Sequence, residues 1–394
     1  MLKRLIPLMA AMMLPGCAQY SDAPAGTVAR PAATLRMPPQ EHAPEDLQVL
    51  FWTAGQRETR FRQMENWFPG YEVPAAKNMR QLERGAGLSP DLKQKIARFM
   101  LETNSAGVMI LQDGKLQHEA YSLGFDATQR WTSFSVAKSF TSTLLGAAVR
   151  DGLIGSLDDS VADYVPELKG TIYEDVTVKQ VATMTSGAAW NEDYSDPDSD
   201  IAKMAAMVSD TENDALVTQL KTLPREAPPG EKFVYKTIET NLLGAIVENA
   251  TGMKLAEYAK AKIVDPAGFE ASMFWMIEPT GRTIGGCCLS LRLADYARLG
   301  QFALDGGEGI VPDGWFGEAG GQQVDFNGSG YGYGYQWWTY PGGNFGAQGI
   351  FGQAISIMPA EKIVAAAVGN WSTASSSDNR RKWLKLVQEI AEAE

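Results

Sequence analysis

A serine and a lysine stand three residues apart at the start of the longest apolar helix that the sequence predicts. Ser135 and Lys138 belong to the phrase Ser-Val-Ala-Lys, and in a helix this spacing puts both side chains on one face. A serine hydroxyl becomes a strong nucleophile only when a base takes its proton, and a buried lysine can be that base because burial lowers its pKa. The apolar residues around Lys138 predict burial. The pair indicates nucleophilic catalysis, although an ordinary helix start with a surface lysine has the same pattern.

Two later segments carry residue types that such a reaction needs. Tyr235 lies in Val-Tyr-Lys-Thr, and a phenol beside a lysine ammonium can carry protons to a leaving group. The stretch 345–353 is rich in glycine, which would let a strand bring its backbone close to a substrate. Taken singly, a packed tyrosine and a hairpin turn account for these two segments as well.

The scarcity of histidine and cysteine argues against several other kinds of site. The chain has only two histidines, His42 and His118, and three cysteines. Neither histidine is well placed for a Ser-His-Asp triad, and no spacing typical of a metal site occurs. We therefore expect no metal and no cofactor. Cys287 and Cys288 are adjacent, and because adjacent cysteines rarely bond we expect two small buried side chains without a disulfide.

The charge of the chain argues against nucleic acid as a partner. The formal net charge is −12 at pH 7, and Lys and Arg form no cluster along the sequence, whereas phosphate binding needs a basic stripe. The sequence says nothing of the oligomeric state.

The elements that must position these residues follow from hydrophobic periodicity and turn signals. Strands are expected near both ends of the chain, and helices between them. The expected strands are 107–112, 115–121, 331–340, 354–358 and 363–368; the expected helices include 135–149, several within about 155–270, and 379–391. The pattern predicts an α/β (α+β) fold: an antiparallel sheet flanked by helices and built from both chain ends, with an inserted, mostly helical subdomain.

The N-terminal stretch has the features of an export signal. Residues 1–16 combine Lys3 and Arg4 with an apolar run too short to span a bilayer. The run ends in Leu-Pro-Gly-Cys, which resembles a bacterial lipoprotein box with Cys17 as the lipidated residue; plain secretion is the alternative. Residues 17–44 are rich in Ala and Pro and predict a flexible tether before a domain over 45–394. We expect an exported protein, periplasmic or anchored to a membrane only through this lipid.

The three segments occur in the order and approximate spacing of the serine β-lactamase and penicillin-binding-protein superfamily. The chain most resembles class C β-lactamase-like esterases and 6-aminohexanoate-dimer hydrolases over roughly residues 50–390. Supporting phrases are Asp-Asp-Ser-Val at 158–161, Met-Thr-Ser-Gly at 184–187, Asn-Glu-Asp-Tyr at 191–194 and Asp-Tyr-Ala-Arg-Leu-Gly at 295–300.

The resemblance implies a role for each motif residue. Ser135 corresponds to the acylated nucleophile, Lys138 to its general base, and Tyr235 to the tyrosine that relays protons. The backbone N–H groups of Ser135 and Ile350 correspond to the oxyanion hole. The resemblance also implies substrate contacts at Tyr194, Thr237 and Gly349.

Two positions depart from the pattern of that superfamily. Its second motif usually ends in Asn or Ser and here ends in Thr237, and its third motif usually begins with Lys or His and here begins with Ala347. The missing cation argues against β-lactams and cell-wall peptides. We therefore expect a serine hydrolase that acts on a small ester or amide through an acyl-enzyme. The alternatives are a β-lactamase or D,D-peptidase, and a non-catalytic cell-envelope lipoprotein that binds or senses a ligand.

Overall fold

The computed structural model describes residues 33–207, 214–307 and 309–393, and within them thirteen β-strands are named. They are β1 (Thr34–Arg36), β2 (Gly70–Val73), β3 (Ser105–Gln112), β4 (Lys115–Tyr121), β5 (Trp131–Thr132), β6 (Met273–Met276), β7 (Leu289–Leu291), β8 (Val324–Asp325), β9 (Gly332–Tyr333), β10 (Trp338–Tyr340), β11 (Asn344–Gln348), β12 (Ala354–Met358) and β13 (Ile363–Gly369).

The α-helices cluster in the middle of the chain and close its end. They are α1 (Ala54–Arg60), α2 (Pro90–Thr103), α3 (Val136–Arg150), α4 (Val161–Tyr164), α5 (Val178–Ala182), α6 (Asp200–Met207), α7 (Ala215–Leu220), α8 (Thr237–Thr251), α9 (Leu255–Ala259), α10 (Asp265–Ala267), α11 (Leu293–Leu304), α12 (Trp315–Ala319) and α13 (Ser377–Ala393). Short 3₁₀ turns are η1 (Pro44–Leu47), η2 (Val49–Phe51), η3 (Met64–Asn66), η4 (Pro166–Leu168), η6 (Pro341–Gly343) and η7 (Ile350–Gly352), and η5 (Lys260–Val264) is one π-helical turn.

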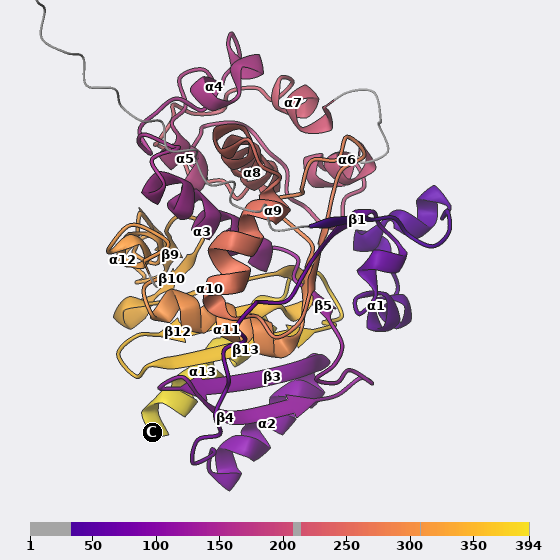
Figure 1. Cartoon of the computed structure of the whole chain (residues 1–394), viewed down its shortest axis with the longest axis vertical. Coiled ribbons are helices and arrows are strands. Elements are labelled where there is room, and N and C mark those ends of the chain that lie inside the picture. The colour runs from indigo at the N-terminus through magenta and orange to yellow at the C-terminus, as the bar shows by residue number, and fades with distance from the viewer. Residues whose placement is uncertain (1–32, 208–213, 308, 394) are drawn as a thin grey trace, which may run out of the picture. The chain divides into compact units, whose positions relative to one another are not determined.

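The larger of two sheets joins the two ends of the chain. Its order is β4-β3-β13-β12-β11-β10-β9-β8, and β3 pairs antiparallel with β13. The hairpin β3–β4 turns through Asp113 and Gly114, both with positive φ, as a tight two-residue turn that follows the strand twist requires. The predicted antiparallel sheet from both chain ends is therefore confirmed (Figure 1).

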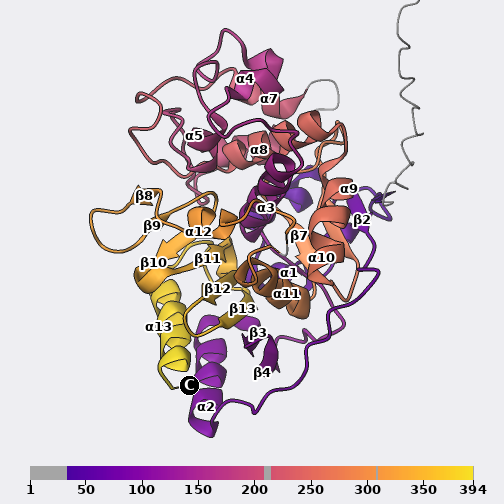
Figure 2. The ribbon, with the colours of Figure 1, turned by 60° about the vertical axis from the view of Figure 1, so that its left-hand side comes forward.

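Both faces of this sheet are covered by helices. Along β3, Val108 and Ile110 pack with residues of α2 and α13, whereas Met109 and Leu111 belong to the core on the other face, where α11 lies. Side chains alternate between the faces of a strand, so a strand buried on both faces is apolar throughout. Figure 2 shows α2 and α13 side by side against the sheet.

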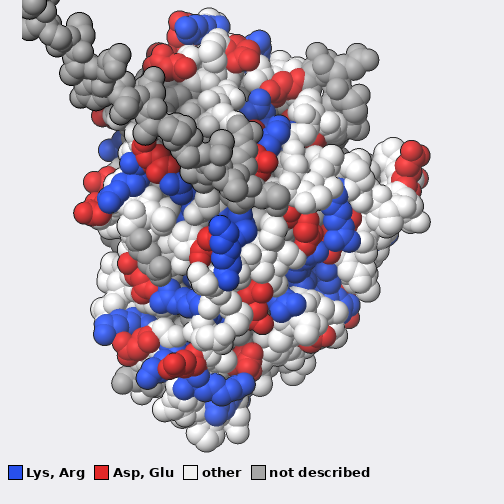
Figure 3. Space-filling model, in the orientation of Figure 1, with Lys and Arg blue, Asp and Glu red and all other residues white. Residues whose placement is uncertain are grey.

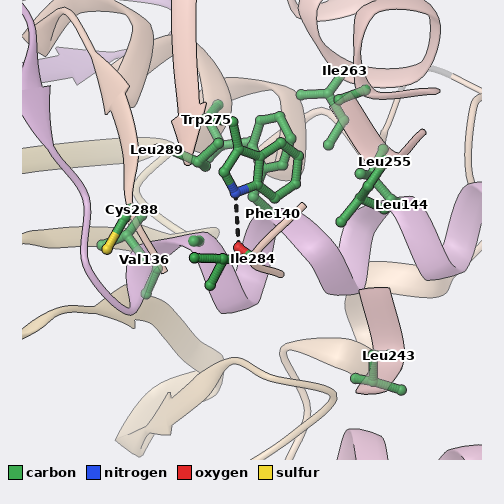
Figure 4. Packing of buried hydrophobic residues seen from close by; sticks show 14 of the residues in the cluster. Val136, Phe140, Leu144, Leu243, Leu255, Ile263, Trp275, Ile284, Cys288 and Leu289 are labelled. Carbon is green, nitrogen blue, oxygen red and sulfur yellow. Dashed lines mark hydrogen bonds between the residues drawn. The ribbon is translucent and has the colours of Figure 1, made fainter. Parts of the chain in front are cut away.

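Helix α3 lies between the sheet and the helical part of the molecule. It contacts β11 on one side and α8 on the other, and its residues from Val136 to Ala148 are buried. Phe140 and Leu144 pack with Leu255, Ile263 and Trp275 (Figure 4). Because the helix is buried on all sides, its polar side chains need partners, and Ser139 and Thr141 donate to the backbone carbonyls of Gln336 and Gly285.

The second sheet was not predicted because its strands are very short. Its order is β1-β2-β6-β7-β5, and the strands have two to four residues each. Strand β1, Thr34–Arg36, pairs with β2, which differs from the flexible tether expected over 17–44. Residues 1–32, and with them the predicted signal segment and Cys17, lie outside the described residues.

The expectation for the adjacent cysteines was wrong. Cys287 and Cys288 form a disulfide in the turn before β7. Cys288 has a φ of 73°, so the backbone adopts an unusual conformation where the two sulfurs meet. Statistics on adjacent cysteines could not predict it, because the pairing depends on how this turn is held.

Two further features concern the surface and the helices. On the face shown in Figure 3, Lys and Arg lie among Asp and Glu rather than in one basic patch. Among the described helices, none combines the length and the apolar character that a membrane crossing requires.

Candidate active site

Ser135 stands at the N-cap of α3, directly after a strained turn. Phe134 has a φ of 43°, and a bulky residue in the left-handed region costs conformational energy. The ring of Phe134 packs against Phe61 and Phe351 with centroids 5.0 and 5.5 Å away. The Leu289 N–H donates to Ser133 Oγ over 3.0 Å. Packing and hydrogen bonding thus fix the turn and present a partly exposed Ser135 at the helix start.

Lys138 is buried one helical turn further on. Only 1% of its surface is exposed, and Nζ donates to Thr237 Oγ1 over 2.8 Å and to the Gly286 carbonyl over 3.0 Å. Burial lowers the pKa of Lys138 to about 8, although the nearby Glu192 carboxylate acts in the opposite direction. An amine with this pKa is partly neutral near pH 8 and can accept a proton.

Tyr235 brings a phenol to the same place. Its ring stacks on Trp338 with centroids 5.6 Å apart, and Lys138 Nζ lies 5.3 Å from the ring centroid. Burial raises the pKa of Tyr235 above its usual value and Glu192 raises it further, while a hydrogen bond with Ser135 and the charge of Arg380 lower it in part. The phenol therefore keeps its proton at neutral pH and is a donor rather than a base.

Two backbone N–H groups, those of Ser135 and Ile350, have no hydrogen-bond partner among the described residues. A side chain on Gly349 would lie 2.5 Å from the Ser133 carbonyl and 3.3 Å from Phe134 Cβ, so this position admits only glycine. Ile350 and Ser135 directly follow the two segments that approach each other here. Within the described part of the chain, neither N–H donates a hydrogen bond. Two such donors are what a tetrahedral oxyanion needs.

Glu192 is a polar residue of the site that the sequence analysis missed. Its Oε1 accepts from the hydroxyls of Tyr194 and Thr237, and its Oε2 accepts from the Thr237 N–H over 3.0 Å and from the indole of Trp190. Since Thr237 also accepts from Lys138, a chain of hydrogen bonds connects the lysine to this carboxylate. The signal was present in Asn-Glu-Asp-Tyr at 191–194, but a carboxylate two residues before a tyrosine does not by itself indicate a partner 45 residues downstream, at Thr237.

A cavity of about 580 Å³ has Glu192, Tyr194 and Phe351 in its lining, whereas Ser135, Lys138 and Tyr235 are not among its lining residues. Its lining also includes Leu50, Phe51, Arg57, Asp193, Ser195, Ser372, Thr373, Ala374 and Ser375. The cavity adjoins the Glu192 end of the cluster and mixes apolar with polar walls.

The predicted site residues come together, with differences in detail. Ser135 and Tyr235 share a hydrogen bond, whereas Lys138 Nζ contacts Thr237 and the Gly286 carbonyl instead of the serine. Tyr194 lines the cavity and donates to Glu192 over 2.9 Å. Within the three described ranges, no group of three or more His, Cys, Asp or Glu residues is arranged to hold a metal ion.

Comparison with known proteins gives matches in sequence. A family model described as Beta-lactamase matches residues 92–283. The chain is 30% identical over 302 residues to a 6-aminohexanoate-dimer hydrolase of Paenarthrobacter ureafaciens, which covers 72% of this chain and 76% of the relative. It is 29% identical over 191 residues to a lovastatin esterase of Penicillium rubens, which covers 44% of this chain and 46% of the relative.

The fold is similar to that of solved structures. A Bacillus anthracis protein provisionally named 6-aminohexanoate-dimer hydrolase superposes with a TM-score of 0.76 at 21% identity. The superposition covers 85% of this chain and 94% of that one. At this identity the likeness concerns the fold alone, and it extends over both the sheet and the helical part.

Proposed function

The chain is a serine hydrolase of the beta-lactamase family, and from this premise we propose that it hydrolyses small linear esters or amides through an acyl-enzyme on Ser135. The observation that carries the proposal is the meeting of Ser135, Lys138 and Tyr235 beside two unpaired backbone N–H groups. The arrangement supplies a nucleophile, a base, an acid and an oxyanion hole, which together are the requirements of acyl transfer.

The pKa of Lys138 is lowered and that of Tyr235 is raised, so the two residues take different proton transfers. Lys138, with its pKa lowered to about 8, is the base that takes the Ser135 proton as the hydroxyl attacks the carbonyl. Tyr235, with its pKa raised, is the acid that protonates the departing alcohol or amine. The phenolate that remains is stabilised by the Lys138 ammonium beside its ring. An acid and a base with pKa values moved apart can run both halves of one reaction.

Hydrolysis of the acyl-enzyme restores both groups. A water molecule gives its proton to the Tyr235 phenolate and attacks the ester carbonyl, and Lys138 returns its proton to Ser135 Oγ as the acid product leaves. In both steps the N–H groups of Ser135 and Ile350 hold the oxyanion. Every proton that leaves a group in acylation is replaced in deacylation, so the enzyme returns to its starting state.

The substrate class follows from position 347 and from the names of the relatives. The Ala347 side chain is fully buried, so the first residue of the third motif offers no cation to a β-lactam carboxylate. One relative is named for the dimer of 6-aminohexanoate and another for an ester. Both support a linear amide or ester rather than a β-lactam or a D,D-peptide.

A substrate panel with Ser135→Ala as the matched inactive variant tests the function. We expect the wild-type chain to hydrolyse p-nitrophenyl esters or the 6-aminohexanoate dimer faster than nitrocefin, and the variant to lose at least about a thousandfold in kcat. Unchanged turnover in Ser135→Ala would disprove the assignment of the nucleophile. Rapid opening of nitrocefin with esters ignored would show instead that the chain is a β-lactamase.

The same experiment separates a binding protein from an enzyme. Mass spectrometry of the intact chain after exposure to a p-nitrophenyl ester reports whether Ser135 carries an acyl group. A stable adduct without turnover would favour a cell-envelope sensor, the non-catalytic alternative. An adduct that forms and decays at the rate of turnover is expected for the hydrolase.

Export and lipidation at Cys17 are a separate proposal that rests on the sequence alone. The short apolar run and the Leu-Pro-Gly-Cys phrase support it. Expression of the full chain in a Gram-negative host with labelled palmitate tests it, with Cys17→Ser as control. Incorporation that the variant loses is expected; equal labelling of both chains, or none of either, would contradict lipidation at this residue.

A further inference from the structure

Arg380, on the first turn of the C-terminal helix, reaches the backbone of the third motif. Its Nη2 donates to the Gly349 carbonyl over 3.2 Å, and its guanidinium carbon lies 4.9 Å from the ring centroid of Trp371. The Trp371 N–H donates to the Phe351 carbonyl over 3.0 Å. The helix and the segment before it therefore hold the loop that follows β11.

The hydrogen bond from Arg380 to the Gly349 carbonyl fixes the direction of the Ile350 N–H. A trans peptide is planar, and its C=O and N–H groups point in opposite directions. The Gly349 carbonyl and the Ile350 N–H belong to the same peptide unit. Holding the carbonyl toward α13 therefore turns the Ile350 N–H away from α13. A cation on the carbonyl oxygen also polarises the peptide and strengthens its N–H as a donor.

Among the described residues, the positive charge of Arg380 is not paired with a carboxylate. Its neighbours Arg381 and Lys382 both pair with Asp378, whereas Arg380 forms no ion pair within the described part of the chain. Its Nη1 is buried without a hydrogen-bond partner among the same residues. A buried donor left unpaired is costly, so this guanidinium has a reason to be there other than stability.

The charge of Arg380 also acts on the tyrosine of the site. Arg380 acts on Tyr235 from α13 and lowers its pKa in part. Burial lowers the pKa of Arg380 itself to about 10, so it remains a cation at neutral pH.

We propose that Arg380 is a positioning residue for the oxyanion hole: it orients the Ile350 N–H through the Gly349 carbonyl. This inference rests on the proposed acyl transfer at Ser135. It adds a residue that lies 245 positions along the chain from the nucleophile and belongs to none of the three motifs.

The test compares Arg380→Met with Arg381→Met, a matched change at the next residue, whose side chain is 73% exposed. Turnover of p-nitrophenyl acetate gives kcat and KM, and phenylboronic acid, which forms a tetrahedral adduct on a nucleophilic serine, reports on the oxyanion hole. For Arg380→Met we expect kcat to fall about 10- to 100-fold with KM changed less than about threefold, because oxyanion donors act on the transition state. The inhibition constant of the boronate should rise by a similar factor. Arg381→Met should match the wild type in all three.

Two further variants, Arg380→Lys and Arg380→Gln, separate a role in positioning from a role in folding. Lysine keeps the charge and one donor, so it should recover part of kcat and of boronate affinity, which a purely structural role would not predict. If Arg380→Met does not fold, Arg380→Gln is measured by the same criteria. Unchanged kcat and boronate affinity in a folded Arg380 variant would overturn the proposal. A wild-type chain without activity on any ester or amide would instead overturn the proposed function.

Discussion

Replacing Glu192 with Gln tests how the protonation of Lys138 is set. Lys138 Nζ donates to Thr237 Oγ1 over 2.8 Å, and the Thr237 hydroxyl donates to Glu192. Two hydrogen bonds in series put the charges roughly 5 Å apart, where two unit charges interact by about 3 kcal/mol at an effective dielectric constant of about 20. One pKa unit corresponds to about 1.4 kcal/mol, so loss of the negative charge should lower the pKa of Lys138 by up to about two units.

The direction of the change follows from the role of Lys138 as a base. The amine must be neutral to accept a proton, so kcat/KM of the wild type should rise with pH and level off above about 8, the pKa of Lys138. In Glu192→Gln the ammonium loses a favourable charge, and the rise should move about one to two units toward lower pH. The plateau should also fall, because one amide oxygen cannot accept from all four donors that Glu192 serves.

The assay is kcat/KM for p-nitrophenyl acetate as a function of pH, with the melting temperature measured for each variant. Asp193→Asn is the control, because this neighbouring carboxylate contacts Ser195 in its own loop and not the chain that leads to Lys138. It should leave the profile where it is in the wild type. A folded Glu192→Gln enzyme whose profile rises at the same pH as the wild type would refute the electrostatic link.

Three further changes have defined outcomes. Gly349→Ala would put Cβ 2.5 Å from the Ser133 carbonyl and displace the Ile350 N–H, so kcat for an ester should fall about 10- to 100-fold with little change in KM; an unchanged kcat would contradict the assigned oxyanion hole. Leu144→Ala removes a fully buried side chain and should lower the free energy of unfolding, measured in urea, by about 3 kcal/mol. A loss below about 1 kcal/mol would mean that neighbouring side chains fill the cavity. Burial raises the pKa of Glu239 to about 7, so its contribution to stability is present below its unfolded pKa and lost as pH rises through about 7. Glu239→Gln should therefore gain stability relative to the wild type between about pH 5 and pH 8, and a constant difference would argue against this titration.

The sequence determined the parts of this protein that depend on local pattern. The spacing of Ser135 and Lys138 on a predicted helix follows from the period of 3.6, and the Asp-Gly turn at 113–114 follows from turn chemistry. The strands at 354–358 and 363–369 follow from short apolar runs between turns. The order of the three motifs added the family, and so the serine-hydrolase chemistry. These signals survive in a single sequence because each rests on residues close together in the chain.

Tertiary structure alone decided what lies across long separations. The contact of Lys138 with Thr237 spans 99 residues, and that of Gly349 with Arg380 spans 31. Neither pair has a sequence signature, because which side chain fills the space beside a buried lysine or a strand end depends on how α3, α8 and α13 pack. The two- to four-residue strands of the smaller sheet are likewise too short to show a period. The sequence therefore identified the nucleophile and its base. The packing of distant segments determined which residues set the charge and the geometry of these two groups.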